Sequence, residues 1–396
     1  MKSLSPTGGH PLLQAAFGKP APVIIPENAP EYVRTHFIAS DGAPIHPIIR
    51  RELGLNPGSR TEPRWYDAIP DMRIHELSGV LLYNGGLYSR NGGIFPESFR
   101  IFHKDYRAQG FYTHFDRATL TGIGTKHFIP QRPAEAPEPA LLECEEILLP
   151  FFTLWPVYGH WLLEAVPCLW AWDEVCRLAG GRRPKLLLSP IQELPAYVKE
   201  FCRPFGITEA DCFFPPASHM RLHRLFLPTR AYMHGAYVSS TAKAVWNRIA
   251  SYHDAFSSLP SPEKIYLSRG RLSGYRAIRG EAACEELFAR RGFTIVHPEE
   301  LSLADQMRLF AEVRYIAGPV GSALHNVVFS RRPDELTILM LSPRDFGSIL
   351  AFSAIEQGYG RILNVVYGSK QDKEAEYQWS LDGKNLEKAV EQWLNE

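Results

Sequence analysis

The sequence predicts an α/β protein with two doubly wound, Rossmann-like domains facing a cleft and a β-containing N-terminal extension. Three observations support this fold class. The last third of the chain alternates short apolar segments with helical ones, and the middle third does the same less regularly. A glycine-rich turn near residue 320 joins an apolar strand to a helix. Regular alternation of strands and helices with short connections is typical of parallel sheets.

The last third predicts the second Rossmann-like layer. A helix over 281–291 ends at Gly292, which suits a C-cap, and another helix begins at Ser302, with Asp305 three residues later as in a capping box. Amphipathic spacing predicts a final helix over 386–394. The expected strands are 264–268, 293–296, 314–317, 336–341 and 362–366.

The middle third predicts the first layer, and the N-terminal part is less regular. Strands are expected at 146–150, 185–188 and 225–227, with helices over 160–178 and 195–205. Residues 1–70 are rich in proline, and residues 80–88 predict two strands joined by a glycine turn. The predicted divisions are an extension over 1–135, a first domain over 136–240, a second over 241–368, and a C-terminal helix over 369–396 that packs back on the first domain.

Composition excludes several classes of function. Lys+Arg and Asp+Glu number 43 each, so no overall positive charge favours nucleic acid. No apolar run is long enough to span a bilayer, and the first residues lack the apolar stretch of a signal peptide. The six cysteines are scattered without Cys-x-x-Cys pairs, as in reduced proteins. We therefore expect a cytoplasmic protein, with at most peripheral contact at the inner face of the cell membrane.

The most informative segment is the turn Gly318-Pro319-Val320-Gly321-Ser322-Ala323, which leads from a strand into a helix. Backbone N–H groups and the positive end of a helix point at one place there, which suits a phosphate. The alternative is that the glycines serve packing alone. The Gly-x-Gly-x-x-Gly and Gly-Lys-Ser/Thr fingerprints are both missing, which argues against a dehydrogenase or an ATPase.

Trp155 to Glu164 is the second informative segment. His160 and Glu164 are four residues apart, so they share one face of a helix, and a histidine beside a carboxylate can act as a base near neutral pH. The alternative is a helix cap with a surface ion pair. The aromatic rings of Trp155, Tyr158 and Trp161 would suit sugar rings, or would belong to the core.

Four arginines follow the predicted strand 264–268, at the end where open α/β sheets bind ligands. Their planar groups match a phosphate, although a solvated basic turn is the alternative. No Asp-x-Asp and no histidine–acid cluster at metal spacing occur in the sequence. Arginines and a helix N-terminus, rather than a metal ion, would then neutralise a bound phosphate. The four are Arg269, Arg271, Arg276 and Arg279.

Four segments, in this order and spacing, resemble the family 61 glycosyltransferases, and the resemblance covers roughly residues 145–345. Bacterial members are often labelled capsular polysaccharide biosynthesis proteins. Two departures are Val320-Gly321-Ser322, where many members have His-Gly-Ala, and Gly280, where many have Asn. The four segments are 159–164, 266–269 with 275–281, 292–302 with Gln306, and 318–329.

The resemblance implies a GT-B fold with the acceptor side first and the donor side second. It also implies inverting transfer of a sugar from a nucleotide sugar, without an essential metal or other cofactor. The donor would be UDP- or GDP-linked, and the acceptor an oligosaccharide or a glycolipid in surface or capsular polysaccharide biosynthesis. No nucleic-acid partner is expected, and the oligomeric state, a homodimer included, stays open.

The expected roles follow from these segments. The donor's diphosphate would lie on Gly321, Ser322 and Ala323, with Arg269 and Arg276 closing on it and the nucleoside near 296–299. His160 or Glu164 would take the acceptor's proton, and imidazole is better matched to neutral pH. Two other classes stay open: a different nucleotide-dependent α/β enzyme, and a catalytically silent scaffold. The remaining donor-binding candidates are Glu281, His297, Glu299, His325 and Asn326, and the acceptor-binding candidates are Trp155, Tyr158 and Trp161.

Overall fold

The structure is a computed structural model of the whole chain, and it is described here over the following residues. They are 30–62, 68–83, 86–89, 95, 99–101, 112–113, 120–122, 128–130, 142–153, 156–188, 193–217, 219–233, 235–272, 274–346 and 350–395.

The chain divides into two compact units, each described by itself. Unit 1 comprises residues 1–44 and 65–245, and unit 2 comprises residues 45–64 and 246–396. The boundary between residues 245 and 246 falls within helix α5 (Ser240–Asp254). Both units combine parallel strands with helices, so the α/β class expected from the sequence is confirmed. Among the helices of the described residues, none is long and apolar enough to cross a membrane.

The sheet of unit 1 has a parallel half and an antiparallel half. In the parallel half, β11 (Leu142–Pro150) lies between β14 (His219–Pro228) and β12 (Lys185–Leu187), and β13 (Cys212–Phe213) follows β12. The antiparallel half comes from the N-terminal part of the chain, which the sequence predicted to be rich in strands. Its strands are β1 (Tyr32–Ala39), β4 (Met72–Leu77), β5 (Val80–Tyr83) and β6 (Gly86–Tyr88).

The helix predicted over 160–178 forms, but its hydrogen-bond spacing changes three times. It begins as α2 (Tyr158–His160), widens to a π-helix over Trp161–Ala165, tightens to a 3₁₀-helix over Val166–Ala171 and ends as α3 (Trp172–Leu178). Pro167 explains the break, because proline has no N–H to donate to the helix ladder. The second predicted helix is α4 (Ala196–Cys202), continued by a short turn over Arg203–Phe205.

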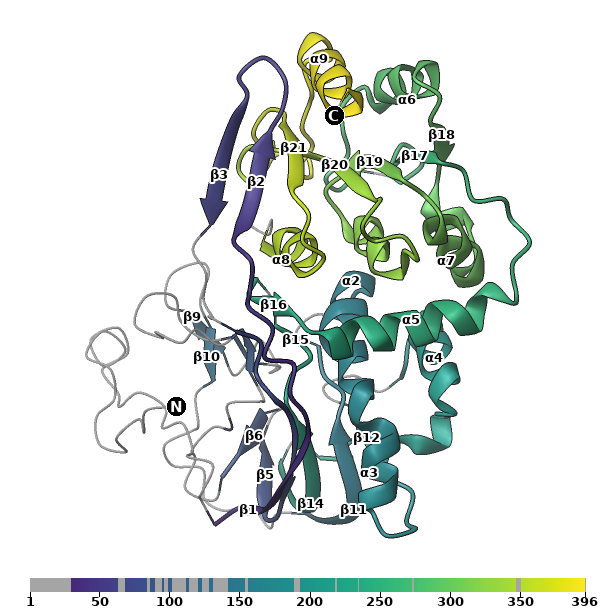
Figure 1. Cartoon of the computed structure of the whole chain (residues 1–396). Coiled ribbons are helices and arrows are strands. Elements are labelled where there is room, and N and C mark those ends of the chain that lie inside the picture. The colour runs from purple at the N-terminus through teal and green to yellow at the C-terminus, as the bar shows by residue number, and fades with distance from the viewer. Residues whose placement is uncertain are drawn as a thin grey trace. The chain divides into compact units, whose positions relative to one another are not determined.

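The sheet of unit 2 is mostly parallel, as the last third of the sequence predicted (Figure 1). Its strand order is β18-β17-β19-β20-β21-β2-β3, and only the edge strand β3 (Gly58–Glu62) is antiparallel. β2 (Ile48–Glu52) comes from the N-terminal region and pairs with β21, which local patterns could not foresee. The remaining strands lie within two residues of the predicted ones: β17 (Lys264–Leu267), β18 (Thr294–Val296), β19 (Tyr315–Pro319), β20 (Thr337–Ser342) and β21 (Leu363–Tyr367).

Helices cover both faces of this sheet (Figure 1). α6 (Glu281–Arg290) and α9 (Gly383–Leu394) lie on one face, and α7 (Leu303–Ala311) and α8 (Leu350–Gly358) on the other. The predicted caps form, because Ser302 Oγ accepts from the N–H of Asp305, and Gly292 adopts a φ of 81°. Gly280, at φ 77°, begins α6 in the left-handed conformation that asparagine also tolerates, so the departure at this position keeps the backbone.

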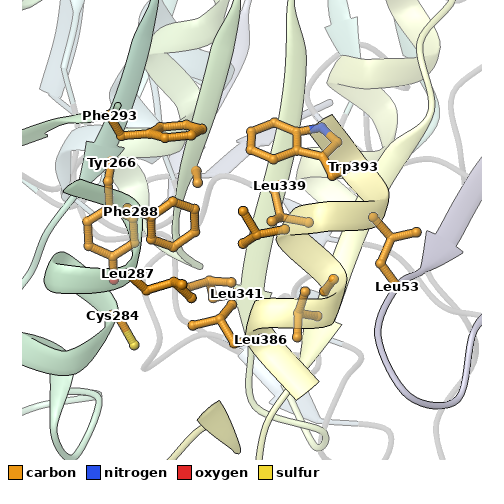
Figure 2. Packing of buried hydrophobic residues seen from close by; sticks show 14 of the residues in the cluster. Leu53, Tyr266, Cys284, Leu287, Phe288, Phe293, Leu339, Leu341, Leu386 and Trp393 are labelled. Carbon is orange, nitrogen blue, oxygen red and sulfur yellow. The ribbon is translucent and has the colours of Figure 1, made fainter. Parts of the chain in front are cut away.

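The C-terminal helix α9 packs in unit 2, whereas the sequence analysis expected it on the first domain. Trp393 packs against Phe293, with ring centroids 5.9 Å apart (Figure 2). It also contacts Tyr315, with centroids 5.6 Å apart, and its Nε1 donates to Thr337 Oγ1 at 2.9 Å. The apolar face of α9 was visible in the sequence, but its partner is set by tertiary packing. The buried residues of that face are Leu386, Ala389, Val390 and Trp393.

We expect Trp393→Ala to lower the free energy of unfolding of unit 2 by about 3–5 kcal/mol, because it removes a fully buried aromatic ring. Denaturant unfolding followed by far-UV circular dichroism would measure this. Phe256→Ala is the control, because Phe256 is 66% exposed and its loss should change the free energy by about 0.5 kcal/mol or less. Equal effects of the two substitutions would contradict the packing of α9 in this core.

Candidate functional site

The strand order of unit 2 reverses between β17 and β19. β17 is the first of the parallel strands after α5. The next strand, β18, lies on one side of it, and the one after that, β19, lies on the other. Open α/β sheets bind ligands outside the carboxyl ends of their strands where the strand order reverses in this way. Arg269 follows β17 by two residues and Gly321 follows β19 by two residues, so both predicted phosphate contacts lie at this point.

The structure brings Arg269 and Gly321 together. A Cβ atom on Gly321 would lie 3.0 Å from Arg269 Nη1, so a side chain at position 321 would crowd the guanidinium. Arg269 Nη2 donates to the carbonyl of Tyr275 at 3.2 Å, while its buried Nε has no hydrogen-bond partner in the described part of the chain. Burial lowers the pKa of Arg269 from its ordinary value. This guanidinium is therefore fixed in place and still has hydrogen-bonding capacity.

The four arginines of the loop fall into two pairs. Arg271 pairs with Glu300, and Arg279 pairs with Asp372 at 2.5 Å, so these two are exposed surface cations with a counterion. Neither Arg269 nor Arg276 forms an ion pair with any described residue. A cation without a counterion, half removed from water, is what an anionic ligand needs.

The turn at Gly321 exposes backbone N–H groups beside these cations. The helix Ser322–Phe329 starts directly after Gly321, and the N–H of Leu324 closes its first turn on the carbonyl of Gly321 at 3.1 Å. The N–H groups before Leu324 have no partner within the helix, as at every helix start. Gly321, Ser322 and Ala323 are all half-exposed, so a ligand can reach them. Val320 is buried, so the side chain at this position is turned away from solvent.

Glu281 lies behind Arg269 rather than at the surface. Its side chain is 4% exposed, and its Oε1 accepts the backbone N–H of Arg269 at 2.7 Å and the hydroxyl of Tyr266 at 3.3 Å. Ser268, also buried, donates to Glu285 Oε1 at 2.5 Å. Burial raises the pKa of Glu281. The residue expected to contact the donor therefore holds the backbone of Arg269 in place, a role that the sequence did not reveal.

The turn after β18 carries His297 and Glu299, and two side-chain amides hold it. His297 Nδ1 lies 4.0 Å from Glu299 Oε1. Gln306 Nε2 donates to the carbonyls of Pro298 at 2.9 Å and Leu301 at 3.3 Å. Asn326 Nδ2 donates to Gln306 Oε1 at 2.9 Å, and Asn326 is fully buried. Asn326 thus connects the helix after Gly321 to this turn and is not exposed to a ligand.

His325 also lies in the interior of unit 2. It is 8% exposed and stacks on the ring of Phe352, with centroids 4.4 Å apart and an interplanar angle of 24°. The sequence placed His325 and Asn326 with the donor-binding residues because they follow the glycine turn directly. The short helix instead turns these side chains inward, since only its first turn reaches the edge of the sheet.

Unit 1 holds His160 and Glu164 as a hydrogen-bonded pair. His160 Nδ1 lies 2.5 Å from Glu164 Oε1. The Glu164 side chain is 2% exposed and the His160 side chain 25% exposed, so the carboxylate lies behind the imidazole. Glu164 Oε2 accepts from Thr153 Oγ1 at 3.4 Å, and Arg230 Nη1 donates to the Glu164 carbonyl at 3.2 Å. A histidine held by a carboxylate in this way can exchange a proton with a ligand.

This pair also lies where a strand order reverses. Thr153 follows β11 and Arg230 follows β14, two neighbouring parallel strands that lie at the reversal of the parallel half of unit 1. The π-helical turn Trp161–Ala165 contains Glu164, and such turns are frequent at functional sites. The sequence analysis missed Thr153 and Arg230, although the rule that ligands bind at strand ends would have selected both.

The aromatic candidates around His160 have different environments. Trp161 is 1% exposed and packs against Phe151, with centroids 5.4 Å apart, so its ring belongs to the core and offers no face to a sugar. Tyr158 is half-exposed and packs against Tyr197 and Phe201, with centroids 5.2 and 5.8 Å away. Trp155 lies outside the described residues.

We expect Glu281→Gln to gain thermal stability relative to the natural protein as the pH rises. Burial raises the pKa of Glu281 above its ordinary value of 4.5, so the contribution of this carboxyl group to stability is complete below pH 4.5 and is lost as the pH passes the raised value. The melting temperatures of both proteins between pH 4.5 and 8 would show this. Glu286→Gln, an exposed position on the same helix, is the control. The prediction would be contradicted if the melting temperature of the natural protein rose relative to that of Glu281→Gln with increasing pH.

The family model described as Glycosyltransferase 61 matches residues 158–337. No match to a curated protein was found. The matched region contains the His160–Glu164 pair of unit 1 and the Arg269–Gly321 contact of unit 2. It also contains most of the parallel strands described above. The match therefore supports a place for this chain among the family 61 glycosyltransferases.

Proposed function

We propose that the protein is an inverting, metal-independent glycosyltransferase of the GT-B type. It would move a sugar from a UDP- or GDP-linked donor to an oligosaccharide or glycolipid in surface or capsular polysaccharide biosynthesis. Unit 2 supplies the donor side and unit 1 the acceptor side. The observation that carries the proposal is the pair of guanidinium groups that have no ion-pair partner among the described residues, of which Arg269 lies over Gly321 at the reversal of the strand order.

The donor's diphosphate lies on the turn at Gly321, where N–H groups of Gly321, Ser322 and Ala323 face it. Arg269 and Arg276 close on the same phosphates. Hydrogen bonds between a guanidinium and a phosphate are charge-assisted and stronger than neutral ones. Their fixed positions suit them to stabilise the negative charge that grows on the leaving diphosphate as the bond to the sugar breaks. Two guanidinium groups then do the work that a metal ion does in other transferases.

The nucleoside lies at the turn that carries His297 and Glu299. This turn follows β18, the neighbour of β17, so it stands at the same edge of the sheet as Arg269. The bonds from Gln306 keep its backbone in one conformation. A polar turn of this kind offers a ring nitrogen and a carboxylate to the hydroxyl groups of a ribose.

His160 acts as the base and Glu164 as the residue that positions it. The acceptor hydroxyl gives its proton to Nε2 of His160 as its oxygen bonds to the anomeric carbon, and the bond to the diphosphate breaks. This single displacement inverts the anomeric configuration. Glu164 accepts the Nδ1–H of His160 and stabilises the imidazolium that forms. The greater exposure of His160 supports this division of roles, which sequence alone left open.

The reaction needs no cofactor beyond the nucleotide-sugar donor, and no nucleic acid takes part. The activated donors of such reactions are made in the cytoplasm, so we place the protein there, with peripheral contact to the membrane where a glycolipid is the acceptor. Tyr158, half-exposed near His160, remains the acceptor-binding candidate with an accessible ring.

We expect Arg269→Ala to weaken binding of UDP or GDP at least about tenfold, because a charge-assisted hydrogen bond contributes about 1.5–3 kcal/mol. Isothermal titration calorimetry in the presence of EDTA would measure this. Arg271→Ala is the matched control, since Arg271 stands in the same loop but pairs with Glu300. The phosphate site is refuted if Arg269→Ala binds both nucleotides as tightly as the natural protein.

We expect His160→Ala to reduce the transfer rate by about 100- to 10,000-fold, the usual contribution of general base catalysis, with unchanged affinity for the nucleotide. Glu164→Gln should shift the pH profile of the rate by weakening the hold on the imidazolium. Transfer from a panel of UDP- and GDP-sugars would be assayed. His223→Ala, at a 39% exposed histidine of the same unit, is the control. Full activity of both site variants would remove this pair from the mechanism.

A further inference from the structure

Unit 2 carries an exposed aromatic corner beside the phosphate turn, formed by Tyr275, Arg276, Phe346 and Tyr377. Tyr275 is 53% exposed and Tyr377 is 39% exposed. Their ring centroids lie 5.6 Å apart at an interplanar angle of 70°. The Arg276 guanidinium lies 4.8 Å from the centroid of Tyr275 and 5.0 Å from that of Phe346, so it sits against both rings. Two tyrosine rings thus face solvent at an angle, and one of them is held in place by a cation.

The backbone of this corner is held in an unfavourable conformation. Arg276, Glu376 and Tyr377, with φ angles of 60°, 51° and 62°, are the positive-φ residues other than glycine in the described part of the chain. Such angles cost free energy in residues with a side chain, and they gather at functional sites. The N–H of Arg276 donates to the carbonyl of Glu376 at 2.9 Å, which joins two segments one hundred positions apart in the sequence. Contacts between these two segments therefore hold the backbone of the corner in a conformation that costs free energy.

Arg269 connects this corner to the proposed phosphate site. Its Nη1 lies over Gly321, and its Nη2 donates to the carbonyl of Tyr275. The turn assigned to the nucleoside, which carries Glu299, follows β18, the neighbour of the strand β17 that precedes Arg269. Arg269 is thus the shared neighbour of the nucleoside turn, the phosphate turn and the corner. A nucleotide sugar has its parts in a fixed order: nucleoside, diphosphate, sugar. With the nucleoside at one neighbour of Arg269 and the diphosphate at Arg269 itself, the sugar comes to the other neighbour.

We propose that Tyr275 and Tyr377 bind the donor's sugar ring. The slightly positive C–H groups on one face of a pyranose pack on the negative face of a tyrosine ring. The second ring, set at an angle, covers the edge of the sugar, and the tyrosine hydroxyls are available to its hydroxyl groups. Arg276 keeps Tyr275 in place from the side it covers and remains free to contact the diphosphate. This inference rests on the proposed function, because it takes the diphosphate to lie on Arg269.

The experiment compares nucleotides with and without the sugar, using the full-length chain. Isothermal titration calorimetry would measure UDP against UDP-glucose and UDP-N-acetylglucosamine, and GDP against GDP-mannose. The variants are Tyr275→Ala and Tyr377→Ala, with Tyr275→Phe as the variant that keeps the ring. Tyr252→Ala is the matched control, because Tyr252 is a tyrosine of α5 with the same 39% exposure as Tyr377. Melting temperatures would show that each variant is folded.

We expect both alanine variants to bind the preferred nucleotide sugar about two- to tenfold more weakly, as the loss of one ring contact predicts, with no change for the nucleoside diphosphate. Tyr275→Phe and Tyr252→Ala should bind like the natural protein. Equal losses for UDP and its sugars would overturn the inference, because the rings would then contact the nucleoside. Unchanged binding, or no sugar that adds to the affinity, would overturn it as well. Failure of UDP and GDP to bind the natural protein would instead refute the proposed function, and this inference with it.

Discussion

The arrangement of unit 2 depends on one constraint: the guanidinium of Arg269 lies against Gly321 and forms no ion pair with a carboxylate in the described part of the chain. A side chain at position 321 would crowd the guanidinium, and the glycine lets the backbone of the turn lie close to the cation. Glu281 holds the backbone of Arg269 from behind through its N–H, at a distance that leaves the guanidinium on the other side. The protein thus uses its buried acid to place the cation rather than to cancel its charge.

Unit 1 likewise places a buried acid behind a basic group, here through a side-chain contact. A buried carboxylate, Glu164, lies behind a partly exposed imidazole and holds its Nδ1. In both units the basic residue, Arg269 or His160, lies at the reversal of the strand order. The buried acid, Glu281 or Glu164, comes from the first turns of the following helix. The sequence match to glycosyltransferase family 61 spans both groups. In the proposed reaction, the groups for donor release and for acceptor deprotonation would thus each lie at a reversal of the strand order.

The backbone beside Tyr275 and Tyr377 adopts an uncommon conformation. The left-handed angles at Arg276, Glu376 and Tyr377 are maintained by contacts between the loop after β17 and the segment after β21. The same contacts set Tyr275 and Tyr377 at an angle to each other in solvent. Because such angles cost free energy and gather at functional sites, they support the proposed binding role of this corner. The neighbouring ion pairs, such as Arg279 with Asp372, tie the two segments together without entering the site.

Local patterns in the sequence determined the strands of unit 2, the caps at Ser302 and Gly292, and the positions of Arg269 and Gly321 at strand ends. Apolar periodicity and turn residues carry that information, because they act over a few neighbours. Tertiary structure alone decided that β2 joins the sheet of unit 2, that α9 packs in unit 2, and that Glu281, His325, Asn326 and Trp161 are buried. It also decided that Arg271 and Arg279 are neutralised while Arg269 and Arg276 are not. These outcomes depend on partners far apart in the chain, which no local pattern records.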